Sequence, residues 1–396
     1  MKFLEHIPVP ERVYTTDLGV QVCSDSRKTL DRLPEATVDL VITSPPFALL
    51  REKEYGNETQ NAYVEWLHTF AERVHRVLKE GGSFVLDLGG AYERGKPVRS
   101  LYQFRVLLDL CDNLGFRLAE EFYWHNPAKL PSPIEWVNKR KIRVKDSVNT
   151  VWWLSKSDWP KADVRNVLAP YSERMKKLIE DPAKFYTPKA RPSGHDISKG
   201  FGNDNGGAIP PNLLQYSNTE ATSSYLRRCK SISRDGHPAR FPSDLPGFFI
   251  KFLTTPGDVV VDIFSGSNTT GRVCEDLERE WLSIEERRDY AALSVVRFTG
   301  DDLSTKGLLS LVEELQSGAC HSILAPFRQS LFSNLCEDAS NGGLLRERPG
   351  TNVAKGIQNK VTYGKAPSPS KKTKEAQPKE ASAKHIPSGK RTKSKD

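Results

Sequence analysis

The most informative segment of this 396-residue chain is Val38-Asp39-Leu40-Val41-Ile42-Thr43-Ser44-Pro45-Pro46-Phe47. Alternating and then continuous apolar residues at 38–42 are typical of a buried strand. Pro45 and Pro46 then stop the strand and remove two backbone donors. The corner presents hydroxyl and carbonyl acceptors with the Phe47 ring just beyond them, which suits an exocyclic amino group on a planar heterocycle. A plain strand end with a Pro-Pro turn is the alternative interpretation.

Strands and helices are expected to alternate around this corner. The expected strands lie at 20–23, 38–42, 83–88 and 116–124, with helices at 63–78 and about 101–114. Gly81-Gly82 is expected to end the first of these helices. The alternation predicts parallel βαβ units in a doubly wound α/β sheet. Ligands of such sheets bind at the carboxyl ends of strands, where Asp25, Ser44 and Asp87 should lie together.

A second ligand-binding segment follows the apolar strand predicted at 259–263. It is the loop Phe264-Ser265-Gly266-Ser267-Asn268-Thr269-Thr270-Gly271, which opens a helix. The loop lacks both the Gly-Lys-Ser/Thr ending of a phosphate loop and the three-glycine dinucleotide spacing. Hydroxyls at a helix N-terminus can still hold a carboxylate, and Glu285 is placed to bond ribose hydroxyls. A nucleoside that bears an amino acid and no phosphate meets these requirements, and S-adenosylmethionine is such a molecule.

Residues 125–236 differ in amino-acid composition from the segments on either side. Apart from a strand expected at 151–154, they are rich in Pro, Gly, Asn and Ser, with a basic run at 139–145 and interleaved aromatic residues. Basic and aromatic residues in loops suit nucleic-acid contact, with phosphates giving affinity and base edges giving specificity. A long irregular insertion with a solvated basic face is the alternative.

Composition places the chain among soluble globular proteins with a polar appendage. Of the formal charge of +8, the segment from Lys365 onward carries +7, so the basic balance resides mainly in a tail that we expect to be disordered. No apolar run approaches a membrane span, and the first residues lack the apolar core of a signal peptide. The six cysteines show no CxxC spacing, so neither a zinc site nor a disulfide framework is expected.

Together, the corner at 43–47 and the loop at 264–271 resemble those of amino-methylating DNA methyltransferases. The closer resemblance is to the β-group N4-cytosine-specific enzymes of bacterial type II restriction–modification systems. Those enzymes carry the catalytic motif first, then the target-recognition region and then the cofactor motif, as this chain does. The resemblance covers about residues 15–300. Segment 237–242 is similar to the lead into the family's cofactor half, and segments 191–195 and 205–210 resemble the recognition region of PvuII-type modification enzymes.

The resemblance implies a role for each matching residue. Catalysis would fall to the tetrapeptide Ser44, Pro45, Pro46 and Phe47, with Asp87 in a supporting role. Cofactor contacts would come from Asp25, Asp262, Phe264, Ser265, Gly266, Ser267, Asn268, Thr269, Thr270 and Glu285, and no metal is implied. In this set Asp25 would bind the adenine amino group and Glu285 the ribose. Adenine-methylating relatives usually carry Asp first in the tetrapeptide, so Ser44 points to cytosine.

The resemblance also implies the organisation and the activity of the protein. The expected parts are a catalytic half (1–124), a target-recognition region (125–236), a cofactor-binding half (237–300), a helical extension (301–345) and a disordered basic tail (346–396). The expected fold is a doubly wound, mainly parallel S-adenosylmethionine-dependent methyltransferase sheet. The expected activity is methylation of N4 of a flipped cytosine in double-stranded DNA, protecting it from a cognate restriction endonuclease.

Several further expectations accompany this activity. We expect a monomer in the cytoplasm with no membrane association, and a CAGCTG-like target follows from the PvuII-type resemblance. Methylation of adenine at N6 remains an alternative within the enzymes. A nucleic-acid-binding module without catalysis remains the alternative from another class.

Overall fold

The structure, a computed structural model, describes residues 1, 3–48, 62–185, 202–218 and 224–323. Strands in these ranges form one ten-stranded sheet, and they are β1 (Arg12–Thr15), β2 (Gly19–Cys23), β3 (Val38–Thr43), β4 (Leu78–Leu88), β5 (Arg117–His125), β6 (Val148–Ser155), β7 (Leu213–Gln215), β8 (Val259–Asp262), β9 (Glu280–Glu285) and β10 (His321–Ser322). Their spatial order is β10-β1-β2-β9-β8-β3-β4-β6-β5-β7. Strands β2, β9, β8, β3 and β4 are parallel, and β6 runs antiparallel between β4 and β5. The expectation of a mainly parallel sheet is confirmed.

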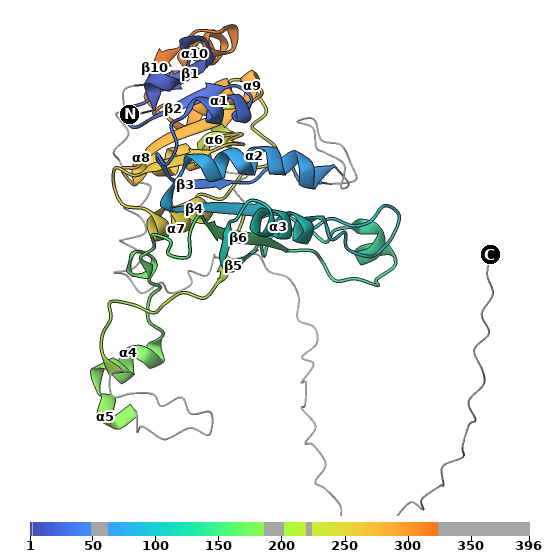
Figure 1. Cartoon of the computed structure of the whole chain (residues 1–396), viewed down its shortest axis with the longest axis vertical. Coiled ribbons are helices and arrows are strands. Elements are labelled where there is room, and N and C mark those ends of the chain that lie inside the picture. Colours follow the sequence, from blue (N-terminus) through green and yellow to red (C-terminus); the bar gives the residue numbers. More distant parts are fainter. Residues whose placement is uncertain (2, 49–61, 186–201, 219–223, 324–396) are drawn as a thin grey trace, which may run out of the picture. The chain divides into compact units, whose positions relative to one another are not determined.

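Helices pack on both faces of this sheet (Figure 1). One face is covered by α1 (Ser26–Arg32), α2 (Tyr63–Val77) and α3 (Tyr102–Asp112). The other is covered by α6 (Ser224–Ser231), α7 (Asp244–Leu253), α8 (Thr269–Asp276), α9 (Arg288–Leu293) and α10 (Thr305–Ser317). Further helical segments are η1 (Leu4–His6), η2 (Val9–Glu11), the π-helical η3 (Glu135–Lys139), η4 (Val164–Val167), α4 (Glu173–Glu180), α5 (Pro182–Phe185) and η7 (Ser294–Arg297). The arrangement is doubly wound, as expected.

Strand β3 shows why the central strands read as continuous apolar runs. Leu40 and Ile42 pack into the core cluster on one face of the sheet, and Val41 packs into the cluster on the other. Side chains alternate between the two faces of a strand, so a strand covered by helices on both sides is apolar at most of its positions. All six residues of β3 are buried.

Two expectations about secondary structure were wrong or incomplete. Gly81-Gly82 does not end α2, which ends at Val77 because Leu78 adopts an extended backbone (ψ 138°). The glycines instead lie within β4, where its register against β3 shifts, and a Cβ on Gly82 would lie 2.9 Å from the Lys79 carbonyl oxygen. Glycine inside a strand is typical of such a close backbone approach. Strands β1, β7 and β10 were not expected, because two to four residues give too short a pattern.

Segments of the expected target-recognition region and of the expected extension contribute to the same sheet and core as the rest of the chain. Strands β6 and β7, from the expected target-recognition region, pair within the common sheet. Helix α10, in the expected extension, packs into the core through Leu308, Val312 and Leu315. The expected tail at 346–396 and segment 191–195 lie outside the described residues. Within the described ranges, no helix has the length and apolarity that crossing a bilayer requires.

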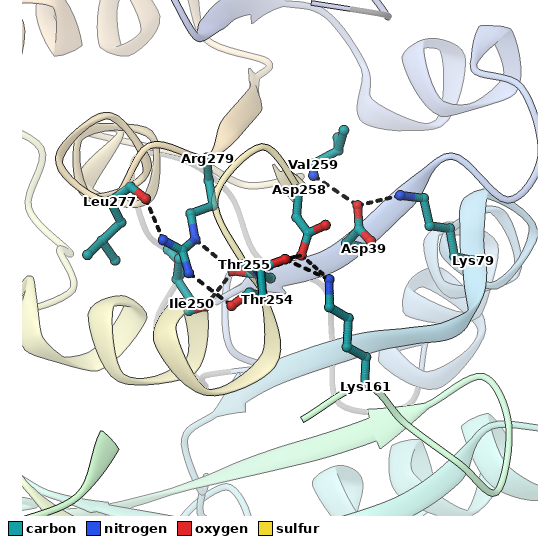
Figure 2. A network of polar contacts seen from close by, with 10 residues as sticks. All are labelled: Asp39, Lys79, Lys161, Ile250, Thr254, Thr255, Asp258, Val259, Leu277 and Arg279. Carbon is teal, nitrogen blue, oxygen red and sulfur yellow. Dashed lines mark hydrogen bonds and ion pairs between the residues drawn. The ribbon is translucent and has the colours of Figure 1, made fainter. Parts of the chain in front are cut away.

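A polar network ties together the amino-terminal ends of three parallel strands (Figure 2). The buried carboxylate of Asp39 in β3 accepts hydrogen bonds from Lys79 Nζ in β4 at 2.7 Å and from the Val259 amide in β8 at 3.0 Å. Nearby, Lys161 pairs with Asp258, which precedes β8. Asp39 therefore holds the neighbours of β3 on both sides, at the edge opposite the strand ends expected to bind ligand.

Replacing this carboxylate tests how much the network contributes to stability. Asp39→Ala is expected to lower the free energy of unfolding by about 2–4 kcal/mol, because the Val259 amide and Lys79 ammonium lose a buried acceptor. Equilibrium urea unfolding measures the change. The matched control is Asp31→Ala, since Asp31 pairs with Arg73 at 2.8 Å but is 52% exposed, and it should lose less than about 1 kcal/mol. Equal losses in the two variants would contradict the assignment.

Candidate active site

Five parallel strands end in a row of polar side chains at one edge of the sheet. Following the spatial order β2-β9-β8-β3-β4, these are Asp25, Glu285, Asp262, Ser44 and Asp87. All five line a single cavity of about 650 Å³. The expectation that Asp25, Ser44 and Asp87 share the carboxyl edge is therefore met, and the corner and the loop lie across one cleft.

Asp262 joins the corner to the loop. One carboxylate oxygen accepts from Thr43 Oγ1 at 2.7 Å and from the Phe264 amide at 3.1 Å, and the other accepts from Thr270 Oγ1 at 2.7 Å. The side chain is only 3% exposed. Burial raises the pKa of Asp262, and the hydrogen bonds from Thr270, Thr43 and Phe264 oppose that rise. The residue predicted to contact the cofactor thus has a second task, which is to hold the two motifs together.

The corner at 44–47 places a hydroxyl beside a buried acid. Ser44 Oγ donates to Asp87 Oδ2 at 2.9 Å, and Asp87 is 2% exposed. Burial raises the pKa of Asp87 to about 6, against the opposing effects of hydrogen bonds from Ser44 and Asn149 and of the Lys129 charge. Because the Ser44 hydrogen is directed at the acid, the oxygen lone pairs remain available to accept a hydrogen bond from a ligand.

The ring of Phe47 lies directly against the backbone that follows β4. A Cβ added to Gly89 would approach the Phe47 ring to 2.4 Å, so this position admits only glycine without movement of the ring. Phe47 and Pro46 both line the cavity. The aromatic ring predicted beside the acceptors is therefore present in the cavity wall.

The loop after β8 owes its shape to Asn268. This residue has a left-handed backbone (φ 53°, ψ 47°), and its side-chain oxygen accepts from the Gly271 amide at 2.9 Å and Ser283 Oγ at 2.7 Å. Its amide donates to Tyr14 OH at 3.1 Å. Asn268 is fully buried and is absent from the cavity lining, unlike the other predicted loop residues Phe264, Ser265, Gly266, Ser267, Thr269 and Thr270. The side chain of Asn268 thus anchors the loop from inside, and its predicted contact with the cofactor stays a prediction.

Two carboxylates at the other end of the cavity have different surroundings. Glu285 accepts from the backbone amides of Gly266 at 2.9 Å and Arg287 at 3.0 Å, and burial raises its pKa to about 7. Asp25 caps α1 through the Arg27 amide at 2.9 Å and pairs with the Arg27 guanidinium at 2.8 Å. Burial would raise the pKa of Asp25, but the Arg27 hydrogen bonds and charge outweigh it, so the pKa is lowered. Asp25 thus lines the cavity and is also an ordinary helix cap.

Aromatic side chains form an apolar wall between these carboxylates and the corner. Phe264 lies 5.6 Å from Trp66 and 5.0 Å from Phe70, measured between ring centroids, and all three line the cavity. A volume of about 650 Å³ is within the range of small-molecule sites. Glu285 keeps lone pairs for hydroxyl donors, and the aromatic wall suits a flat heterocycle. The residues present therefore fit a nucleoside that carries an amino acid, as S-adenosylmethionine does.

The cavity also has a wall that the motifs did not indicate. It is built from residues of 124–240, namely Trp124, Asn126, Lys129, Ser147, Asn149, Asn218, His237, Ala239 and Arg240. Most of these belong to loops or strand ends without a local pattern. The pairing of β6 with β4 and of β5 with β6 brings Trp124 and Asn149 beside the end of β4. The aromatic residues interleaved in this region do not all indicate a surface for nucleic acid. Tyr225, for example, is buried beneath the Arg297 guanidinium.

Comparisons with known proteins agree with this geometry. A model of the DNA methylase family matches residues 38–296. The chain is 58% identical over 305 residues to the type II methyltransferase M.PvuII of Proteus hauseri, covering 77% of this chain and 91% of that relative. It is 28% identical over 279 residues to M.ScaI of Streptomyces caespitosus, covering 70% and 80%.

Similarity extends to a solved structure. The structure titled PvuII DNA methyltransferase (cytosine-N4-specific) matches with a TM-score of 0.65 and 47% identity, covering 79% of this chain and 97% of that one. Residues 38–296, which the DNA methylase family model matches, contain both the corner and the loop. This confirms the family resemblance that those two motifs indicated. The chain belongs to the DNA methylase family.

Proposed function

We propose that the protein transfers a methyl group from S-adenosylmethionine to the N4 amino nitrogen of cytosine in double-stranded DNA. The observation that carries this proposal is the single cavity in which Ser44, backed by Asp87, faces the loop at 264–270. The cytosine-N4 specificity of the similar PvuII DNA methyltransferase supports cytosine. Ser44, rather than Asp, at the first position of the tetrapeptide favours cytosine over the alternative of adenine N6. An intact corner beside an intact loop favours catalysis over nucleic-acid binding alone.

The cavity offers separate contacts for each part of the methyl donor. Glu285 would accept hydrogen bonds from the ribose hydroxyls, and the loop after β8 would hold the amino-acid part. Phe264 would pack against the adenine, and Asp25 would bind the adenine amino group. S-adenosylmethionine supplies an electrophilic methyl group on a sulfonium. Anchoring by Asn268 and Asp262 fixes the loop before the ligand arrives, which lowers the entropic penalty of binding.

The corner prepares the cytosine amino group for attack. This nitrogen shares its lone pair with the ring and is a poor nucleophile. Ser44 Oγ and the Pro45 carbonyl oxygen accept hydrogen bonds from its two N–H groups. This frees the nitrogen lone pair to form the new nitrogen–carbon bond as the sulfur–carbon bond breaks. Phe47 stacks on the base, which must leave the duplex to reach this depth. Positioning and electrostatics supply most of the rate.

Asp87 accounts for the proton that the nitrogen loses. As the new bond forms, that proton passes to Ser44 Oγ and the Ser44 hydrogen passes to Asp87 Oδ2, 2.9 Å away. Asp87 then releases the proton to solvent. A raised pKa suits this task, because an acceptor works best when its pKa lies near the working pH.

The biological setting extends this proposal. Residues 125–236 would read the DNA, with a CAGCTG-like site as the expected target. The basic segment around η3 and β6 supplies exposed cations such as Lys139, Arg140 and Lys141 for phosphate contact. Methylation in the cytoplasm would protect that site from a cognate restriction endonuclease, and one chain carries both motifs, so we expect a monomer to act.

Removing the Ser44 hydroxyl tests the catalytic corner. Ser44→Ala is expected to lower kcat for methyl transfer to duplex DNA by about 100-fold or more, since the amino group loses an acceptor and its proton loses its route. The dissociation constant for S-adenosylmethionine should change by less than about twofold. Radiolabelled methyl transfer and calorimetric titration measure the two quantities.

A matched control for this variant is available on the surface. Ser310 Oγ also donates to a carboxylate, that of Glu314 at 2.9 Å, but on the exposed face of α10. Ser310→Ala should retain full activity. Full methylation by Ser44→Ala would refute the role of the corner, and failure of the unaltered protein to methylate DNA would refute the function itself.

The pH dependence tests the role of Asp87. The carboxylate accepts a proton only when it is ionised, so kcat at saturating donor should fall about tenfold per unit below pH 6 and level off above it. The methyl donor must be saturating because Glu285, whose pKa is about 7, would affect the binding of the donor and not the chemical step. Asp87→Asn should abolish the acid limb together with most of the rate. A kcat that stays flat from about pH 5 to pH 8 would contradict the assignment.

A further inference from the structure

Asn149 contacts the proposed proton acceptor, although no motif pointed to it. Its side-chain amide donates to Asp87 Oδ1 at 3.1 Å and lies 3.5 Å from Oδ2. Asn149 stands near the start of β6, which runs antiparallel to β4 and pairs Thr150 with Leu88. It also lines the cavity. The carboxylate thus has Ser44 on one oxygen and Asn149 chiefly on the other.

The segment that carries Asn149 is fastened from two sides. Asp146 accepts from Arg99 Nη1 at 2.7 Å, and the Arg99 guanidinium lies 4.7 Å from the centroid of the Tyr92 ring. The Ser147 carbonyl accepts from the Asn126 amide at 2.9 Å. These contacts leave Asn149 little freedom, so its amide is held in place before any substrate binds.

Asn149 differs from every titratable group that faces Asp87. Lys129 is a cation at longer range, and Tyr63 and Tyr102 are phenols whose pKa values are raised chiefly by burial and further by the Asp87 charge. An amide donates a hydrogen bond without adding a counter-charge. It therefore stabilises the ionised carboxylate while leaving that group basic enough to take up a proton.

We propose that Asn149 is a positioning residue for methyl transfer, which orients the Asp87 carboxylate so that Oδ2 faces the Ser44 hydroxyl. The inference rests on the proposed function and deepens it. In the step concerned, the proton lost by the methylated nitrogen passes to Ser44 Oγ as the Ser44 hydrogen passes to Asp87 Oδ2. The Asn149 amide keeps its own hydrogens throughout, and the proton leaves Asp87 for solvent.

The experiment compares kcat against pH for the unaltered protein and two variants. Asn149→Leu keeps the volume of the side chain and removes the donor, so the acid limb should move up by about one pH unit. Asn149→Asp adds a like charge and should move the limb further in the same direction. The dissociation constant for S-adenosylmethionine should stay within about twofold in both.

A second readout does not depend on activity. Without the hydrogen bond from Asn149, ionisation of Asp87 in the folded protein costs more free energy. The urea midpoint of Asn149→Leu should therefore lie further below that of the unaltered protein at about pH 8 than at about pH 5. Asn113→Leu is the matched control, because Asn113 also donates to an acid, Asp109 at 2.7 Å, but on the exposed end of α3. Asn113→Leu should leave the acid limb of the kcat profile where it is in the unaltered protein. The difference in urea midpoint between this variant and the unaltered protein should be the same at every pH.

The outcomes separate the inference from the function beneath it. An unaltered protein that does not methylate DNA would overturn the proposed function. Methylation by the unaltered protein with an unmoved acid limb in both Asn149 variants would overturn the role of Asn149 alone. A lower kcat at every pH without displacement of the limb would also count against it, because a purely structural role predicts that pattern.

Discussion

The site depends on one buried carboxylate. Asp262 takes hydrogen bonds from Thr43 and Thr270 at 2.7 Å each, and 219 residues separate Asp262 from Thr43 in the sequence. Strand pairing between β3 and β8 brings the corner and the loop to neighbouring strand ends, and Asp262 then fixes their mutual orientation. That contact places the corner at 44–47 and the loop after β8 on two sides of one cavity. Burial makes the bridge strong, because no water competes for its partners.

Burial also divides the work among the acids of the same sheet edge. Asp25 lies beside an arginine and stays readily ionised, whereas Asp87 and Glu285 are desolvated and have raised pKa values of about 6 and 7. Desolvation disfavours the charged form, and a neighbouring cation favours it. One architectural feature, the common end of five parallel strands, thus yields acids suited to different tasks at neutral pH.

The sequence predicted those parts of the site that are local in the chain. Pro45 and Pro46 determine the backbone of the corner at 44–47, and small residues determine that of the loop at 264–271. Both segments could therefore be predicted from the sequence, together with most of the residues around them. Asn149 could not be found, since its contact depends on antiparallel pairing of β6 beside β4. The inward anchoring of Asn268 could not be found for a similar reason, because its partner Tyr14 lies 254 residues away on an unexpected strand.

The identity of the methylated base tests the account most directly. Duplex DNA treated with the protein and S-adenosylmethionine can be digested to nucleosides and analysed by mass spectrometry. A corner built on Ser44, with Asp87 behind it, predicts N4-methylcytosine as the product. N6-methyladenine, or DNA without any methylated base, would contradict the account.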